Sequence, residues 1–168
     1  YLKNIFKSNF LQISISSDVV GAEYAAIIKN IYAILTGVCS GLGYGDNFIA
    51  VLITSSANEL NNLLTILDSK DRIITKAAYL GDLLVTCYSA HSRNRSLGFL
   101  IGKGLPLPKA LSQTKMVAEG YHACASIYKI IFNLKRNEDA PILNCAYNIM
   151  HLGNDPQTEI TTLTPLIS

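Results

Sequence analysis

The segment from residue 20 to residue 38 constrains the fold more than any other part of this chain. It is apolar nearly all round and rich in Ala and Ile, and only Glu23 and Lys29 interrupt it with a charge. A helix that is apolar on almost every face must be covered on most sides, so the segment predicts the central helix of a bundle. The two charged residues also make it a poor membrane span.

The rest of the chain has the periodicity of helices almost throughout. Three glycines between residues 41 and 45 end the first helix, and Asp46 can cap a long second one. Pro141 suits the first position of a later helix, and Asp155 followed by Pro156 begins a last turn or two. The sequence predicts an all-α fold with helices at residues 20–38, 47–68, 72–78, 82–88, 93–101, around 109, 119–134, 142–151 and from 155 onward.

Residues 11–16 are the exception, because apolar and polar side chains alternate there with period two and predict a short strand. No partner strand is evident in this chain, and an unpaired strand exposes its backbone groups. We therefore expect residues 1–17 to be a remnant of a preceding nucleotide-binding domain, and residues 18–168 to form one helical domain. A start at Tyr1 rather than Met fits a truncated or proteolysed chain.

The composition excludes several classes of protein. With 168 residues, 49% hydrophobic and 15% charged, the chain is expected to fold as a compact domain with a real core. A net charge of +2 without long basic runs favours neither nucleic acid nor an anionic membrane as a partner. The four cysteines form no Cys-x-x-Cys pair and the three histidines have no metal-ligand spacing. These patterns predict free thiols in a reducing cytoplasm and no metal site.

Lys29 and Asn30 are candidate functional residues on the central helix. A single lysine on a long helix usually extends its amine to water, and that is the simplest alternative. Here Glu23, Ile28 and Ile31 leave little polar surface around it. A charged amine in such a place needs a cavity, a carboxylate or a ligand.

A second group of candidates lies in the middle of the chain. Asp82 stands at a predicted helix start with Thr86 one turn later, and Asp82 alone would be read as an ordinary N-cap. Ser92, Arg93 and Asn94 begin the next helix, where a solvated helix start and a phosphate site are both possible. An amine, a carboxylate and a guanidinium together suit a substrate that carries a carbonyl or hydroxyl and a phosphate.

Eight short stretches resemble signature segments of the bacterial NAD(P)-dependent glycerol-3-phosphate dehydrogenases, and they span nearly the whole chain. They are DVVGAE (18–23), IKN (28–30), GLGYGDN (41–47), LGDL (80–83), TC (86–87), SRNR (92–95), VAEG (117–120) and PI (141–142). The resemblance implies that family's all-helical, substrate-binding C-terminal domain, a bundle of the 6-phosphogluconate dehydrogenase C-terminal-like type. It also implies a preceding Rossmann domain that binds NAD or NADP.

The resemblance further implies roles for the matching positions. Lys29 would be the general acid/base at the C2 oxygen of dihydroxyacetone phosphate, and Asp82 would bind substrate hydroxyls and orient Lys29. The other positions would contact substrate or cofactor: Asn30 and Thr86 as hydrogen-bond partners, Ser92, Arg93 and Asn94 at the phosphate, and Arg93, Val117 and Glu119 at the cofactor. A cytoplasmic homodimer that feeds glycerophospholipid synthesis is implied as well. The chain alone is expected to be inactive.

Two departures from the family pattern and two alternatives accompany this interpretation. Ser55 and Ser56 stand where relatives usually have Arg-Gly, which would cost an arginine contact, and Tyr79 stands where a Gly is common and would crowd the approach to Asp82. The first alternative is the substrate domain of a related hydroxy-acid dehydrogenase. The guanidinium of Arg93, as a phosphate-binding group, argues against a substrate without a phosphate. The second is a catalytically silent helical interaction module.

Overall fold

The computed structural model describes residues 1–114 and 118–167, and within them it contains helices and no strand. The all-α prediction is therefore confirmed. The helices are α1 (Leu2–Phe6), α2 (Val19–Leu42), α3 (Asp46–Leu67), α4 (Asp82–Tyr88), α5 (Arg93–Gly102), α6 (Leu107–Gln113), α7 (Glu119–Asn133), α8 (Pro141–Tyr147) and α9 (Pro156–Leu163), with π-helical turns η1 (Ala77–Gly81) and η3 (Asn148–Leu152) and 3-10 turns η2 (Asn137–Asp139) and η4 (Thr164–Leu166).

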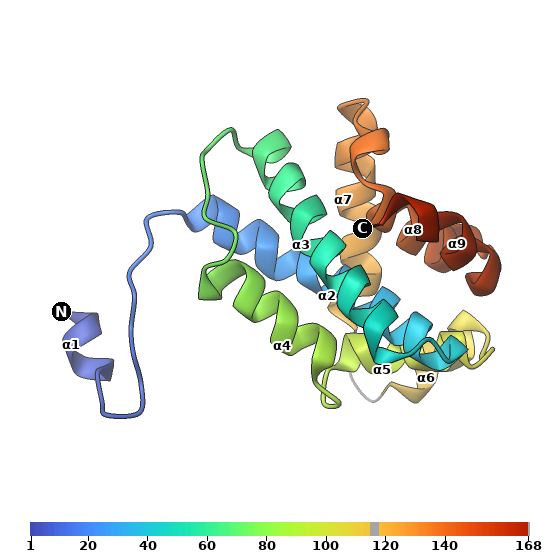
Figure 1. Ribbon diagram of the computed structural model, residues 1–168, viewed down its shortest axis with the longest axis horizontal. Coiled ribbons are helices and arrows are strands. Elements are labelled where there is room, and N and C mark those ends of the chain that lie inside the picture. Colours follow the sequence, from blue (N-terminus) through green and yellow to red (C-terminus); the bar gives the residue numbers. More distant parts are fainter. Residues whose placement is uncertain (115–117, 168) are drawn as a thin grey trace.

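Helix α2 is the centre of the bundle, as its apolar sequence predicts, and runs between α3 and α4 in Figure 1. Every residue from 31 to 39 is buried. Asp18 caps the start of α2 by accepting a hydrogen bond from the Gly21 N–H, and Gly43, with φ of 95°, ends it. By length and composition alone α2 could cross a membrane, but 67% of its most apolar window is buried inside the fold.

Glycines allow α5 to cross α2 at very close range. A Cβ at Gly98 of α5 would stand 1.8 Å from the carbonyl oxygen of Ile34, and one at Gly37 of α2 would stand 2.0 Å from the carbonyl oxygen of Arg95. Real Cβ atoms do not approach so closely, so only glycine fits at these positions. The crossing brings the beginning of α5 beside the middle of α2, where Asn30 and Asn94 meet.

The predicted helix at residues 72–78 is wrong, because residues 69–76 form an irregular connection before η1. The side chain of Arg72 explains the difference. Its Nη1 donates to the carbonyl oxygens of Leu64 and Asp68, at 3.2 and 2.7 Å, and so satisfies acceptors at the end of α3. The guanidinium also binds the carboxylates of Asp18 and Asp68, which fixes the backbone near Arg72 outside a helix.

The strand predicted at residues 11–16 does not form in the described part of the chain. A strand requires a partner for its backbone groups, and among the described residues this segment exchanges backbone hydrogen bonds only locally, between Leu11 and Ser8 at 3.4 Å. Instead, α1 and the irregular connection that follows it lie apart from the bundle, with Phe6, Phe10 and Ile15 exposed (Figure 1). The remaining helices lie close to their predicted bounds, and α8 begins at Pro141 as expected.

Candidate functional site

Lys29 and Asp82 form an ion pair between α2 and the start of α4. The Lys29 Nζ donates to the Asp82 Oδ1 at 2.5 Å, and the two side chains are 19% and 36% exposed. Of the cavity, carboxylate or ligand that such an amine needs, the carboxylate is therefore present. Because both groups remain partly accessible, a small polar molecule could reach the amine and the carboxylate together.

The backbone around Asp82 is shaped by the π-helical turn η1, which runs directly into α4. The side chain of Asp82 does not cap α4, so the simple N-cap interpretation is wrong. Thr86 lies one turn later, and its hydroxyl donates to the carbonyl oxygen of Asp82 at 2.6 Å. Thr86 thus supports the backbone of Asp82 rather than contacting Lys29.

Asn30 and Asn94 are joined in a short chain of amide hydrogen bonds. The Nδ2 of Asn94 donates to the Oδ1 of Asn30 at 3.0 Å, and its Oδ1 accepts from the N–H of Gly120, also at 3.0 Å. Asn94 is only 4% exposed. Both the Nδ2 and the Oδ1 of Asn94 are thus hydrogen-bonded within the fold. These bonds hold α2, α5 and the start of α7 together beside Lys29.

The beginning of α5 carries the expected cationic group. Ser92 caps the helix by accepting a hydrogen bond from the Arg95 N–H at 3.3 Å. The next residue, Arg93, is 44% exposed and lies 3.3 Å from the carboxylate of Glu119 at the start of α7. An accessible guanidinium at a helix N-terminus can accept a phosphate group. Val117, the other expected cofactor contact, lies outside the described residues.

A cavity of about 550 Å³ opens next to Arg93 and is also lined by His91, Arg95 and Phe99. The Nε of Arg95 is buried and has no hydrogen-bond partner among the described residues. Neither Lys29 nor Asp82 lines this cavity, so the cavity beside Arg93 and the Lys29–Asp82 pair are separate features of the site. Across residues 1–114 and 118–167, no group of three or more His, Cys, Asp or Glu side chains could hold a metal ion.

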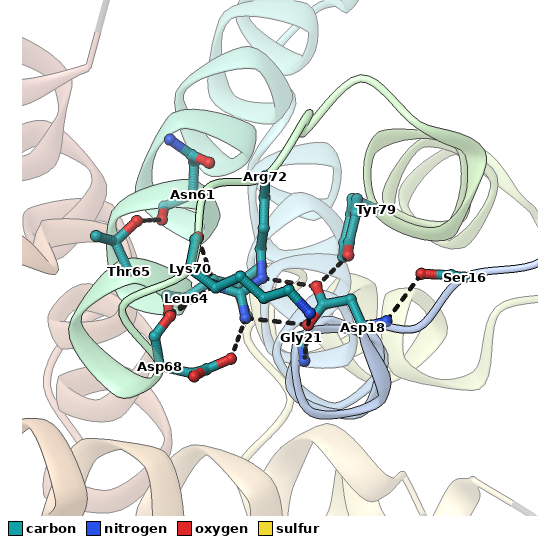
Figure 2. Close-up of polar contacts among 10 residues, drawn as sticks. All are labelled: Ser16, Asp18, Gly21, Asn61, Leu64, Thr65, Asp68, Lys70, Arg72 and Tyr79. Carbon is teal, nitrogen blue, oxygen red and sulfur yellow. Dashed lines mark hydrogen bonds and ion pairs between the residues drawn. The ribbon is translucent and has the colours of Figure 1, made fainter.

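Sequence reasoning missed the cluster around Asp18, which is drawn in Figure 2. The Asp18 carboxylate accepts hydrogen bonds from Arg72 and from the hydroxyl of Tyr79. The Arg72 guanidinium and the Tyr79 hydroxyl hold the pKa of Asp18 well below its usual range. Tyr79 was expected to crowd Asp82, but its hydroxyl turns toward Asp18 instead. Asp18 lies 54 residues before Arg72 and 61 before Tyr79, so no local pattern could have indicated the cluster.

The other departure lies on α3. Ser56 is buried and donates to the carbonyl oxygen of Leu52. Beside Ser55 there is a cavity of about 150 Å³ that Glu59 and Asp139 also line.

Comparison with known proteins agrees with the arrangement. Relatives named glycerol-3-phosphate dehydrogenase [NAD(P)+] from Clostridium botulinum strain Alaska E43 and Staphylococcus haemolyticus are 37% and 34% identical over 161 and 162 residues. Each alignment covers 96% of this chain and 48% of the relative, so the chain spans about half the length of these proteins.

Solved structures show the same fold. The glycerol-3-phosphate dehydrogenase of Coxiella burnetii superposes with a TM-score of 0.90 and 29% identity, over 97% of this chain and 50% of that one. The yeast enzyme, at 21% identity, superposes with a TM-score of 0.85 over 94% of this chain and 46% of its own. A profile described as "NAD-dependent glycerol-3-phosphate dehydrogenase C-terminus" matches residues 18–161. The chain therefore belongs to the family of NAD-dependent glycerol-3-phosphate dehydrogenase C-terminal domains.

Proposed function

We propose that this chain is the substrate-binding half of an NAD(P)-dependent dehydrogenase that interconverts glycerol 3-phosphate and dihydroxyacetone phosphate. The observation that carries the proposal is the Lys29–Asp82 pair, an amine and a carboxylate in contact at 2.5 Å and open to solvent. Family membership and the names of the relatives support it. Lys29 donates a proton to the C2 oxygen of the ketone during reduction and accepts it back during oxidation.

Asp82 has two tasks in this proposal. One carboxylate oxygen holds the Lys29 amine, and the other is available for a substrate hydroxyl. Thr86 steadies the backbone of Asp82, and Asn30 holds the start of α5 through Asn94. These contacts keep the amine and the carboxylate in a fixed relation, which general acid/base catalysis requires.

Arg93 and the capped start of α5, at Ser92, hold the substrate phosphate. The guanidinium offers a fork of N–H groups, and the helix N-terminus adds backbone donors. The expectation that Asn94 also contacts the phosphate stays a prediction. In this structure its side chain is buried and hydrogen-bonded within the fold. Requiring a phosphate distinguishes this substrate from a simple hydroxy acid.

The residues present fit the outer edge of a dinucleotide site. Arg93 and Glu119 form an accessible charged pair, in which the guanidinium suits a cofactor phosphate and the carboxylate suits a ribose hydroxyl. When bound, NAD or NADP supplies or accepts the hydride at C2. The described residues contain no strand-turn-helix for a pyrophosphate, so we expect no turnover from this chain alone. A homodimer, a cytoplasmic location and a role in phospholipid synthesis are parts of the same proposal.

The test measures oxidation of NADH and NADPH that depends on dihydroxyacetone phosphate, in the complete enzyme that joins this chain to its nucleotide-binding half. In Lys29→Ala we expect kcat to fall by about 10²–10⁴-fold while substrate still binds, since a proton-transfer group contributes that much. Unphosphorylated dihydroxyacetone is the substrate control. Preference for it would favour the related hydroxy-acid enzyme, and a folded wild-type protein without activity would favour the silent interaction module.

A further inference from the structure

Two cross-links join α2 to the segment formed by η1 and α4. One is the ion pair of Lys29 with Asp82, and the other is the hydrogen bond from the Tyr79 hydroxyl to the carboxylate of Asp18. Asp18 caps the start of α2 and Lys29 lies eleven residues later. Eleven residues make about three turns of an α-helix, so both links use nearly the same face of α2. On the other side, Tyr79 precedes Asp82 by three residues.

The Asp18–Tyr79 link is buried and held from several directions (Figure 2). Tyr79 is 4% exposed and Asp18 is 9% exposed. Arg72 donates to the Asp18 carboxylate through Nε at 2.7 Å and through Nη2 at 3.2 Å. Burial and the neighbouring carboxylate raise the pKa of Tyr79, so its hydroxyl stays protonated and remains a donor.

Arg72 extends this link to the end of α3. Its guanidinium binds the carboxylate of Asp68 and the carbonyl oxygen of Leu64. The side chain of Arg72 is only 2% exposed. Asp18 is therefore fixed between the beginning of α2 and the end of α3, and it offers a rigid anchor to the hydroxyl of Tyr79.

Asp82 depends on η1 for its position. Its N–H is directed to the carbonyl oxygens of Ala77 and Tyr79, in the wide turn of a π-helix. Such turns are rare, less favourable than an α-helical turn, and frequent at functional sites. An isolated π-turn can therefore shift toward α-helical geometry, and any such shift would move the first residue of α4. The hydroxyl of Tyr79 anchors the middle of this turn to Asp18.

We infer that Tyr79 is a positioning residue whose hydroxyl, held by Asp18 and Arg72, fixes the π-turn that presents Asp82 to Lys29. The inference rests on the proposed function, because it assigns to Tyr79 an effect on the Lys29–Asp82 pair. The hydroxyl of Tyr79 donates to Asp18 and is not assigned a contact with Lys29 or the substrate. Its contribution passes through the backbone of η1, so removing the hydroxyl disturbs catalysis only while the carboxylate of Asp82 is present.

The experiment is a double-mutant cycle in the complete enzyme, with kcat and KM measured well below the unfolding temperature. Tyr79→Phe removes one oxygen atom and should lower kcat roughly tenfold, since a misplacement of about 1 Å can cost ~10²-fold. In the Asp82→Asn background the same substitution should change kcat by less than about twofold, because the group that it positions has already been altered.

Tyr32→Phe is the matched control. Tyr32 is also a buried tyrosine on the core side of α2, and its hydroxyl donates to a carboxylate, that of Glu59, at 3.0 Å. Tyr32→Phe should lower the unfolding temperature about as much as Tyr79→Phe does, and it should leave kcat unchanged. If Tyr79→Phe is too unstable to assay, Asp18→Asn tests the same link, because asparagine retains the N-cap but not the charge that holds Arg72 and Tyr79.

The outcomes separate the inference from the function on which it rests. A wild-type enzyme without dihydroxyacetone phosphate reduction overturns the proposed function and the inference with it. An active wild-type enzyme overturns the inference alone in two cases. Either Tyr79→Phe lowers only the unfolding temperature, as Tyr32→Phe does, or it lowers kcat equally with and without the carboxylate of Asp82.

Discussion

Lys29 on α2 and Asp82 on α4 are 2.5 Å apart, nitrogen to oxygen, although 53 residues separate them in the sequence. Both side chains are partly exposed, and ion pairs of this kind contribute only about 0–1 kcal/mol to stability. A pair that adds little to folding but lies open beside a buried core is well suited to binding a ligand. Its substitution should therefore separate activity from stability.

Asp82→Asn in the complete enzyme should lower kcat by about 10²-fold, because the amide cannot hold the Lys29 amine as an ion pair. The free energy of unfolding of the chain, measured by urea denaturation, should change by less than about 1 kcal/mol. A large loss of stability with kcat preserved would assign Asp82 to the fold instead of to the site.

The crossing of α2 and α5 predicts a strong effect of the smallest possible substitution. In Gly98→Ala, the new methyl group would meet the carbonyl oxygen of Ile34 at 1.8 Å, and the helices must separate. We expect a loss of about 2–3 kcal/mol in the free energy of unfolding, as in other overpacked cores. Gly45→Ala is the control, since a Cβ there meets nothing within 4 Å and the φ of Gly45 is −80°. Equal stabilities of the two variants would contradict the close crossing.

Arg72 should matter far more to stability than an exposed arginine in an ion pair. In Arg72→Ala the buried carboxylate of Asp18 would keep only the longer, more exposed ion pair with Lys70, at 3.7 Å, and we expect a loss of about 3 kcal/mol in the free energy of unfolding. The comparison is Arg136→Ala, whose pair with Asp139 is exposed and should contribute nothing measurable. Chemical denaturation of both variants at neutral pH measures the difference. An unchanged midpoint for Arg72→Ala would mean that the cluster in Figure 2 does not support the fold.

The sequence predicted those parts of the fold that depend on local pattern. The apolar run of α2 and the starts of α8 and α9 at Pro141 and Pro156 follow from periodicity and capping alone. The irregular segment after α3 could not be predicted, because Arg72 reaches Asp18 across 54 residues. Tertiary contacts of that kind override helix propensity.

The candidate site divides in the same way. Lys29 and Asp82 were expected to meet, and they do. The roles of Thr86 and Asn94 in supporting the backbone and neighbouring helices depend on which atoms lie nearby in three dimensions. Likewise, the glycines of α5 look like ordinary small residues until the carbonyl groups of α2 are placed against them. Spacing in a single sequence indicates which chemical groups are available, but not which neighbours engage them.

Glu59 should make the stability of the chain depend on pH near neutrality. Its carboxylate is buried and accepts hydrogen bonds from the N–H groups of Ile142 and Leu143 and from the hydroxyl of Tyr32. Burial raises the pKa of Glu59 from 4.5 to about 7, although these hydrogen bonds oppose the shift. The folded chain thus holds this proton more tightly than the unfolded chain does.

The sign of the effect follows from this difference. The tighter proton binding by Glu59 in the folded chain stabilises the fold by on the order of 3 kcal/mol in the free energy of unfolding. This contribution is fully present below about pH 4.5 and is lost as the pH rises through about 7. The glutamine side chain of Glu59→Gln cannot ionise, so the free energy of unfolding of this variant should not decline over this pH range. The changed hydrogen bonds at the start of α8 lower its free energy of unfolding by the same amount at every pH. Urea denaturation of both proteins between pH 4.5 and 8 measures the two slopes. Parallel slopes would show that Glu59 is ionised in the folded chain throughout this range, with the hydrogen bonds from α8 and Tyr32 outweighing its burial.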